Sequence, residues 1–471
     1  MTPSALVTES HPRPTLDSRQ PGLTPQLPPG PPAVSSNPIA VLRFARELGK
    51  DPIEFQRKRF AAYGDTYTSR VGKQLTLVTR EPAHIVHVLL EDAQSYQKPE
   101  TGLISAQMKR VLGNGLVTSN GELWKEQRRQ VQPAFGAQHI RGYAATMVEA
   151  GQRWVERWRT DAELDVSEQM MGLTLQIVAR VLMGETLHSE QDELARLMRS
   201  WRASASSLSS AVPPWLPYPP RWREARVRER LCARLAQLID RHRREQASDC
   251  LLSVLAQQLE QPGSMSREQL VDETLTLFFA GHETTSHALS WTLYLLSQNP
   301  DARALLNREL DEVLGSRPPC LEDVARLPYT GQVLAESMRL YPPAFTLARQ
   351  ARARTTLGPW DVPAGALLIL SLYHVQRDAR HHPDPERFLP ERFAPEAAAA
   401  IHPGAYLPFG AGTRTCIGKR FAQLEATLLL ATLCQSLSFE LAQEHAPRRA
   451  ADITLGPRPL RMRVQRRRAS A

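Results

Sequence analysis

The sequence predicts a mainly α-helical protein with a small β-rich region, and two segments give the clearest support. Residues 266–298 form one long apolar run, which Ser266 and Gln269 begin as a capping box and Asn299-Pro300 ends. At 1.5 Å per residue this helix would extend about 50 Å, enough to cross a whole domain. Residues 66–70 and 74–78 look instead like two strands of a hairpin that turns near Gly72.

Other segments extend this prediction along the chain. Residues 1–36 are rich in Pro, Ser and Gln, so we expect an extended or disordered N-terminal tail that buries little apolar surface. A helix is predicted to end at Gly184, and another to cover residues 419–437. The first has an apolar face made of Met170, Leu173, Ile177 and Val181. Residues 37–471 are predicted to form a single domain, because the motifs described below interlock along them.

The amino-acid composition limits which kinds of partner and metal site are expected. The chain has 471 residues and a formal charge of +9, which favours an acidic partner or a membrane surface. No nucleic-acid motif accompanies this charge, so no nucleic-acid partner is expected. Five cysteines without a C-x-x-C pair argue against a zinc site and a disulfide scaffold.

The start of the chain shows no targeting signal. It lacks a basic region followed by an apolar core, so neither a signal peptide nor an N-terminal transmembrane anchor is expected, and the cytoplasm is the expected location. The apolar stretch over residues 270–296 contains His282, Glu283 and His287, and therefore indicates a buried helix rather than a membrane span.

Cys416 has the most informative surroundings. It lies in the sequence FGAGTRTCIG over residues 409–418, just before a predicted helix. A thiolate is a nucleophile and a metal ligand that needs positive surroundings, which Arg414, the helix N-terminus and backbone N–H groups would supply. Gly412 and Gly418 would let the backbone approach where a side chain would collide, and Phe409 could shield the sulfur from water. The alternative, a buried structural cysteine, explains neither the glycines nor the arginine.

The pattern F-x-x-G-x-R-x-C-x-G resembles the haem-thiolate signature of the cytochrome P450 family. The resemblance implies the cytochrome P450 fold and a haem (iron protoporphyrin IX) cofactor with Cys416 as its axial ligand. It also places Phe409, Gly412, Arg414 and Gly418 at the cofactor. The matching motifs keep the family's order, and the likeness covers nearly everything after residue 37.

An acid and an alcohol follow two small residues in the middle of the long helix, in the sequence AGHETT over residues 280–285. Buried polar groups of this kind need partners, and the small residues would leave room for something to lie against the helix. By resemblance, Glu283 and Thr284 match the family's acid–alcohol pair, which relays protons during dioxygen activation. A solvent-facing polar stripe is the alternative, which the flanking apolar residues oppose. His282 is expected to be a satisfied core histidine or a surface group.

Glu336 and Arg339 lie three residues apart on one predicted helical face. Such a pair is usually an exposed ion pair of little value. By resemblance, however, Glu336, Arg339 and Arg392 form the family's buried structural triad, in which bidentate geometry fixes orientation. Arg387 is a rival for the third position.

Trp124 and Arg128 are one helical turn apart and offer an indole N–H and a planar guanidinium. The W-x-x-x-R pattern resembles the family's haem-propionate-binding helix, and Arg349 and Arg414 match further propionate contacts. Without the other motifs, Trp124 would be interpreted as a core tryptophan.

The resemblance implies a haem-thiolate monooxygenase that uses dioxygen to hydroxylate an unactivated carbon. Electrons are expected from a ferredoxin or flavodoxin with its reductase, since the chain ends soon after the haem helix. Isomerisation or dehydration without dioxygen, and a non-enzymatic haem sensor or carrier, are alternatives that Glu283 and Thr284 oppose.

A lipophilic small molecule is the expected substrate, because the segments expected to line the pocket are largely apolar. These segments are the loop of residues 97–113, the face around Phe278 and Phe279, and residues 344–347. Similarity to soluble bacterial carotenoid hydroxylases makes a carotenoid or other terpenoid the first candidate, while fatty acids and polyketides remain open.

Residues 213–222 fall where the family has its mobile lid. Their aromatic residues Trp215, Tyr218 and Trp222 stand beside arginine, which suits peripheral contact with a membrane. A proline-stiffened loop packed on the domain is the equal alternative.

Overall fold

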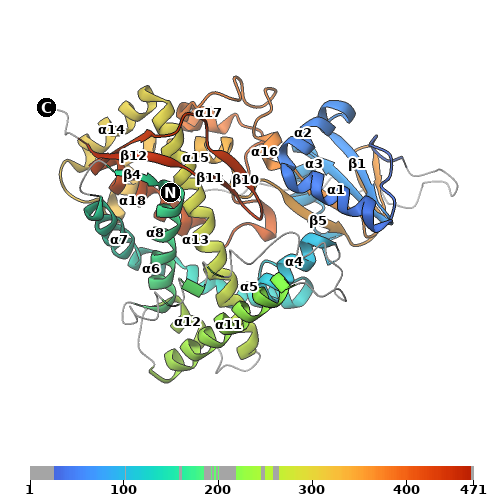
Figure 1. The fold of residues 1–471 in the computed structure, drawn as a ribbon, viewed down its shortest axis with the longest axis horizontal. Coiled ribbons are helices and arrows are strands. Elements are labelled where there is room, and N and C mark those ends of the chain that lie inside the picture. The colour runs from blue at the N-terminus through green and yellow to red at the C-terminus, as the bar shows by residue number, and fades with distance from the viewer. Residues whose placement is uncertain are drawn as a thin grey trace, which may run out of the picture.

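The computed structural model describes residues 26–100, 102–158, 162–184, 219–245, 250–257 and 265–467, together with residues 193, 196, 197 and 200. Helices account for most of these residues, and the strands form small sheets beside the helical body (Figure 1). The predicted mainly α class with a small β region is therefore confirmed. None of the helices in these ranges has an apolar stretch long enough to cross a lipid bilayer.

Helix α13 (Arg267–Gln298) runs through the middle of the molecule (Figure 1). The Gln269 N–H donates to Ser266 Oγ and the Ser266 N–H donates to Gln269 Oε1, so the predicted capping box is confirmed. The helix packs along α8 (Val166–Met183), which ends at Gly184 as predicted, and against α11 (Pro219–Glu245). Most of α13 is consequently buried, although it carries polar residues.

The other helices surround α8 and α13. They are α1 (Pro38–Lys50), α2 (Pro52–Tyr63), α3 (Pro82–Val86), α4 (Leu103–Leu112), α5 (Gly121–Val131), α6 (Ala137–Gly142), α7 (Ala144–Arg157), α12 (Leu251–Gln257), α14 (Pro300–Leu314), α15 (Pro328–Leu340), α16 (Leu372–Val375), α17 (Pro395–Ala399) and α18 (Lys419–Ser436). Helices α7, α13 and α18 meet in the largest apolar cluster, where Met147, Leu289 and Leu429 have no exposed surface.

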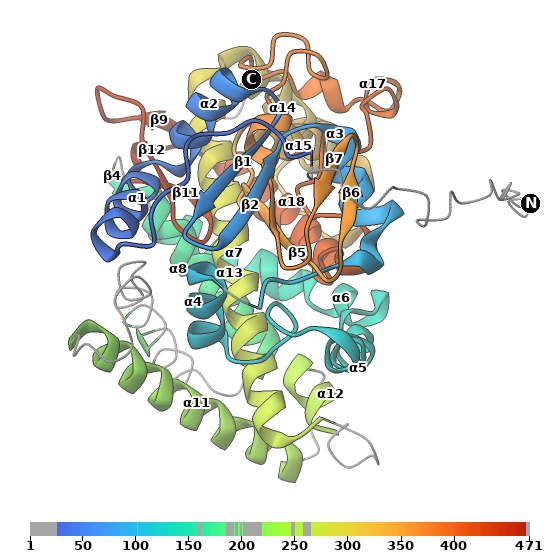
Figure 2. The same ribbon diagram turned by 90° about the vertical axis from the view of Figure 1, so that its right-hand side faces the viewer.

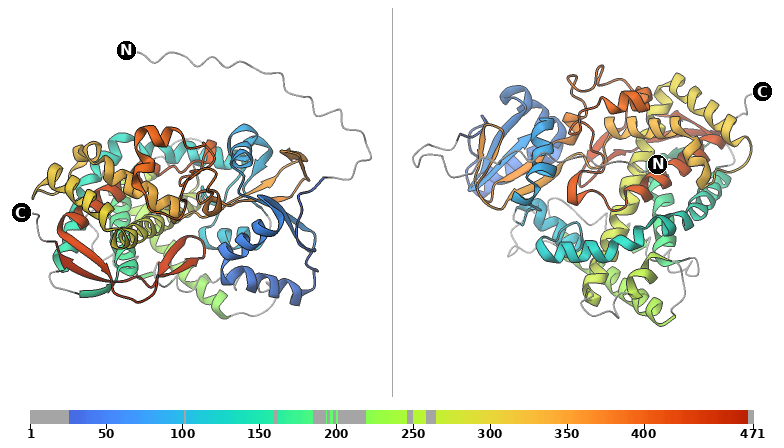
Figure 3. Two further views of the ribbon diagram at one scale, coloured as in Figure 1. Left: turned by 90° about the horizontal axis from the view of Figure 1, so that it is seen from above. Right: turned by 180° about the vertical axis from the view of Figure 1, so that it is seen from behind.

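A five-stranded sheet lies to one side of the helical body (Figures 2 and 3). Its order is β1 (Thr66–Val71), β2 (Gln74–Thr79), β8 (Leu367–Leu370), β5 (Leu347–Ala351) and β3 (Tyr96–Gln97). The hairpin of β1 and β2 turns at Gly72, whose φ of 56° lies in the left-handed region, as predicted. Strands β2 and β8 pair in parallel, and the other neighbours pair antiparallel.

Three smaller sheets complete the β structure. A three-stranded sheet has the order β4 (Ala162–Asp165), β12 (Arg461–Arg466) and β9 (Leu437–Leu441). Two hairpins pair β6 (Thr355–Leu357) with β7 (Trp360–Val362), and β10 (Arg448–Ala451) with β11 (Leu455–Arg458).

The end of the proline-rich segment is attached to the edge of the large sheet. The Thr68 N–H donates to the Pro29 carbonyl at 2.9 Å, and the Val34 N–H donates to the Arg70 carbonyl at 2.8 Å. Strand β1 is an edge strand, so its outer N–H and C=O groups are available to such a segment. Of the two states expected for residues 1–36, extended or disordered, residues 26–36 are extended and are bonded to the sheet; residues 1–25 lie outside the described ranges.

The expected pocket loop over residues 97–113 contains helix α4 instead, which ends at Gly113. The segment after α4 is bonded to α13 at two acids. The Asn114 N–H donates to Asp272 Oδ2 at 2.8 Å, and the Leu116 N–H donates to Glu273 Oε2 at 3.0 Å. Leu116 and Glu273 are 157 residues apart in the sequence. The local sequence pattern therefore gave no sign that residues 114–116 are held by α13.

Of the expected aromatic lid, Trp215 and Tyr218 lie outside the described residues. Trp222 lies in the first turn of α11 and is 56% exposed. Its ring is therefore presented to solvent rather than packed on the domain.

Candidate active site

The loop before α18 turns back on itself and presents Cys416. The Cys416 N–H donates to the Phe409 carbonyl at 2.9 Å, and the Thr415 N–H donates to the Gly412 carbonyl at 3.0 Å. Gly418 then caps the N-terminus of α18. This order puts the cysteine at the end of the loop, directly before the positive end of a helix dipole.

The two glycines expected to permit close approach behave differently. Gly412 has φ of 70°, and a Cβ there would lie 2.1 Å from the Leu89 carbonyl oxygen, so only glycine fits. A Cβ on Gly418 would make only ordinary contacts, 3.7 Å from a ring carbon of Phe135 and 4.0 Å from the Cys416 sulfur. The expected collision at Gly418 is therefore wrong; that residue contributes its backbone N–H, which stabilises the thiolate.

Opposing effects act on the Cys416 thiol. Desolvation by the loop packed around the sulfur raises its pKa, while the Gly418 N–H, Arg128 and Lys419 act in the opposite direction. By residue surface Cys416 is nevertheless exposed, so the half-buried Phe409 does not close it off from water. The sulfur thus remains accessible to a ligand while three donors or charges favour its anionic form.

One face of the otherwise buried helix α13 is open. Leu277, Ala280 and Thr284, which are spaced by three and four residues, keep partial exposure, whereas Phe278 and Phe279 are packed in an apolar core cluster. The expectation that the two phenylalanines line the pocket is thus wrong, and the neighbouring face is the open one.

Ala280 and Gly281, the two small residues before the acid–alcohol pair, have separate roles. A Cβ on Gly281 would lie 3.1 Å from Val178 Cγ2, so this glycine permits close packing of α8 rather than leaving room for a ligand. Ala280 and Gly281 are both partly exposed, and only Ala280 adds a side chain to the open face.

The acid–alcohol pair, Glu283 and Thr284, lies at the edge of this open face. Thr284 Oγ1 donates to the Ala280 carbonyl at 2.9 Å and is partly exposed, while Glu283 is 5% exposed. His282 is buried, with Nδ1 2.8 Å from the Phe278 carbonyl, and is a satisfied core histidine. The structure therefore brings Thr284, but not His282, to the open face.

Glu336 and Arg339 form a bidentate pair with no exposed side-chain surface. Arg339 Nε and Nη2 donate to the two carboxylate oxygens at 2.7 and 2.8 Å. Arg392 Nε lies 3.4 Å from Glu336 Oε1, whereas Arg387 is 69% exposed and faces Asp384. Arg392 is thus the third member of the triad, as the sequence predicted over its rival.

The Arg339 guanidinium also donates to the carbonyls of Gln376, Pro385 and Arg387. It therefore connects α15 to the segment that leads to the Cys416 loop. A buried pair with its remaining hydrogen bonds satisfied fixes geometry, and losing one partner would cost about 3–5 kcal/mol.

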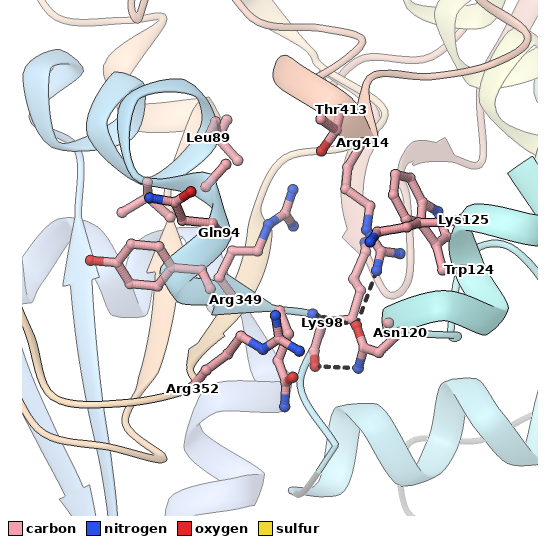
Figure 4. Close-up of a pocket in the computed structure, with 15 residues that line it drawn as sticks. Leu89, Gln94, Lys98, Asn120, Trp124, Lys125, Arg349, Arg352, Thr413 and Arg414 are labelled. Atoms are coloured by element: carbon pink, nitrogen blue, oxygen red, sulfur yellow. Dashed lines mark hydrogen bonds between the residues drawn. The ribbon is translucent and has the colours of Figure 1, made fainter.

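Five cations line one pocket (Figure 4). Lys125 and Arg352 are exposed, whereas the other three are buried or half-buried: Lys98, Arg349 on β5 and Arg414 in the Cys416 loop. Burial lowers the pKa of Arg349 and of Arg414 to about 10. Burial, with repulsion from both arginines, lowers the pKa of Lys98 to about 7. Within the described ranges none of the three pairs with a carboxylate, so the pocket favours an anionic group.

Trp124 and Asn120 shape this pocket. Arg414 lies over the Trp124 ring, 4.0 Å from its centroid, and donates to the Ser119 carbonyl and to Asn120 Oδ1 at 2.9 and 3.1 Å. Asn120 also accepts from the Lys98 N–H at 2.9 Å and so connects the two cationic segments.

Arg128, one turn beyond Trp124, does not line the pocket. Its Nη1 donates to the Thr415 carbonyl at 2.8 Å, beside Cys416. The structure thus brings Trp124, Arg349 and Arg414 to the pocket and directs Arg128 to the thiol loop.

Sequence reasoning missed Lys98 and Glu425. Lys98 stands alone in an irregular segment and carries no motif. Glu425 lies on α18 with no exposed surface, and neither carboxylate oxygen has a hydrogen-bond partner of good geometry among the described residues. Burial raises the pKa of Glu425 to about 8, an effect that the nearby Thr285 hydroxyl only partly offsets. The sequence did contain one signal for Glu425, namely an acid at a helical position where the neighbours on the same face are apolar.

Comparison with known proteins agrees with this arrangement. The sequence model described as cytochrome P450 matches residues 28–464. Cyclooctatin synthase of Streptomyces melanosporofaciens is 35% identical over 426 residues, covering 88% of this chain and 91% of that protein. Pentalenene oxygenase of Streptomyces avermitilis is 30% identical over 439 residues, covering 91% and 96%.

A solved structure, retinoic acid bound cyanobacterial CYP120A1, superposes with a TM-score of 0.83. It is 26% identical, and the match covers 94% of this chain and 100% of that one. The similarity therefore extends over the sheets as well as the helical body.

Proposed function

The chain belongs to the cytochrome P450 family of haem-thiolate monooxygenases, and from this premise we propose that it hydroxylates a lipophilic terpenoid, with a carotenoid as the first candidate. The observation that carries the proposal is the open face of α13, formed by Leu277, Ala280 and Thr284, which offers a largely apolar surface beside a reactive alcohol.

The residues present fit the haem cofactor of this family. Lys98, Arg349 and Arg414 converge without a carboxylate partner among the described residues, which suits the two negative propionates. We propose Cys416 as the residue that would ligate the haem iron, with Phe409, Gly412 and Gly418 shaping the loop around it. Trp124 would support the propionate side, and Arg128, which was expected there, would instead support the Cys416 loop through the Thr415 carbonyl. When bound, the haem supplies dioxygen activation, and thiolate ligation favours O–O cleavage.

Glu283 and Thr284 are proposed to deliver protons. The Thr284 hydroxyl proton is directed at the Ala280 carbonyl, so its oxygen can accept a further hydrogen bond from the open side. Glu283 precedes it and is buried, so bulk water does not reach this acid freely. Together they would pass protons inward while the surrounding apolar residues exclude water.

Known relatives support a terpenoid. Pentalenene oxygenase and cyclooctatin synthase are named for terpenoid chemistry, and the solved structure holds retinoic acid, a polyene. Fatty acids and polyketides are the alternative classes, since the open face by itself selects only for an apolar ligand.

Electrons are proposed to come from a small acidic ferredoxin or a flavodoxin with its reductase. Lys419 and Arg420, directly after the Cys416 loop, are exposed and have no ion-pair partner in the described part of the chain. Exposed cations beside the thiolate would attract an acidic protein to this face.

Ligand titration tests the substrate class. A carotenoid or related terpenoid should shift the Soret band of the ferric holoenzyme, and turnover should add one hydroxyl, identified by mass spectrometry. Ala280→Phe fills the open face and should weaken the shift while leaving the carbon monoxide spectrum unchanged, which controls for an intact site. Tight binding of fatty acids or polyketides without any terpenoid response would reassign the substrate.

A further inference from the structure

A second cavity lies between α13, α14, α18 and strand β9, and it shares no lining residue with the cationic pocket. Four buried side chains of the largest apolar cluster line part of it: Leu293, Leu296, Leu437 and Phe439. Figure 1 shows α14 at the end of the molecule away from the sheet that contains β1 and β5. From Lys419 to Cys434, which also lines the cavity, α18 is about 22 Å long at 1.5 Å per residue. The cavity is therefore remote from the Cys416 loop.

The side of this cavity formed by α14 is polar. Arg303 and Asn307 are four residues apart and so lie on one face of the helix, and both are half-buried lining residues. Within the described ranges neither side chain makes a hydrogen bond or an ion pair. Asp311, an acid further along α14, pairs instead with Arg467. The guanidinium and the amide are thus unused donors at the edge of an apolar space.

The charges around the cavity favour an anionic ligand. Among the described residues that line it, Arg303 is the only cation and Glu440 is the only acid. Glu440 is exposed, and Arg463 stands directly opposite it across the pair of β9 and β12, so water and a cation both offset its charge. Arg303 is half-buried without a carboxylate partner in the part of the chain that the structure describes, so a negative head group would gain most there.

The volume of the cavity limits the size of its ligand. It encloses about 180 Å³, and an apolar cavity of about 150 Å³ accommodates benzene. Cys434 adds a neutral thiol to the lining, because burial raises its pKa to about 12, and so does not repel an anion. One six-membered ring with a short polar substituent therefore fits, whereas the terpenoid or fatty acid considered as substrate needs a larger pocket.

We propose that this cavity is a second ligand site, which binds a small aromatic carboxylate with its ring among the leucines and Phe439 and its carboxylate against Arg303 and Asn307. The site goes beyond the proposed hydroxylation, because its ligand does not reach the Cys416 loop and is not oxidised. A ligand there would join the C-terminal end of α13 to α14 and stabilise the folded state by its binding free energy.

Binding of benzoate to the holoenzyme, measured by ligand-observed NMR, tests the proposal, with benzyl alcohol as a neutral ligand of similar size. Benzoate should bind more tightly than benzyl alcohol and should leave the Soret band unchanged, because the cavity is remote from Cys416. Arg303→Gln should weaken benzoate binding about tenfold, since it removes a charge-assisted hydrogen bond, and should leave benzyl alcohol binding unchanged. Asn307→Phe should fill the cavity with a ring and abolish binding of both ligands.

Arg308, exposed on α14 and outside the cavity lining, provides matched controls. Arg308→Gln and Arg308→Phe should leave both affinities unchanged, and the carbon monoxide spectrum of each variant reports an intact fold. Absence of benzoate binding, a Soret shift caused by benzoate, binding that survives Asn307→Phe, or an equal loss in the Arg308 controls would overturn the proposal. If Asn307→Phe does not fold, Arg303→Gln decides the matter, because an unchanged benzoate affinity in that variant also overturns the proposal.

Discussion

Glu425 makes a strong prediction because it is a fully buried acid without a well-formed hydrogen bond. It lies on α18, and the neighbouring Thr285 hydroxyl directs its proton to the Gly281 carbonyl at 3.2 Å. The pKa of Glu425 is accordingly raised from 4.5 to about 8. The folded state therefore favours the protonated acid, while the unfolded chain ionises near the ordinary value.

Because of Glu425, the free energy of unfolding should fall as the pH rises. The group's contribution to stability is fully present below pH 4.5, is lost progressively as pH rises, and stays constant once the folded form also ionises near pH 8. Within this window the loss is about 1.4 kcal/mol per pH unit. Glu425→Gln removes the titration, so the free energy of unfolding of the wild type should fall relative to the variant by about 2.7 kcal/mol between pH 5.5 and 7.5.

Urea unfolding of both holoenzymes across this range, followed by circular dichroism, measures the difference. Glu440→Gln, at an exposed acid on β9, is the matched control and should show no pH-dependent difference from wild type. If the Glu425→Gln difference is constant across the range, the carboxyl is not held protonated and the reasoning is refuted.

Three further predictions concern the reaction. Cys416→His should abolish the red-shifted Soret band of the reduced carbon monoxide complex, and an unchanged spectrum would contradict the proposed ligand. Thr284→Ala should still bind haem and substrate but divert reducing equivalents to peroxide and water; NAD(P)H use coupled to product as in wild type would contradict the proton role. The association rate with a ferredoxin should fall with salt, as the Debye length shrinks from ~10 Å at 0.1 M to ~3 Å at 1 M, and a flat response would exclude charge-guided docking.

Sequence reasoning succeeded where the information is local. Three predicted features depend only on residues that are close in the sequence, and all three are found. They are the capping box at Ser266, the end of α8 at Gly184 and the hairpin turn at Gly72. The choice of Arg392 over Arg387 also held, although it relied on family resemblance rather than on local chemistry.

The parts that were missed depend on contacts between distant segments. Helix α4 is followed by residues that hydrogen-bond to acids on α13, and residues 26–36, expected to be extended or disordered, are extended and hydrogen-bonded along β1. The pKa of the pocket cation Lys98 is lowered first by burial and then by repulsion from Arg349 and Arg414, which lie far along the chain. Phe278 and Phe279 were placed on the wrong face because two adjacent aromatic residues do not reveal which side of a helix stays open.

The hydrogen bonds from residues 114–116 to α13 have a mechanical consequence. Asp272 and Glu273 hold this segment about two turns before Ala280, on the same rigid helix that carries Thr284. Gln127 on α5 also donates to the Asn114 carbonyl at 2.8 Å, so three segments are joined at one point. Residues 114–116 cannot move without either breaking these bonds or moving α13 with them, so the position of this segment is coupled to that of the helix that carries Thr284.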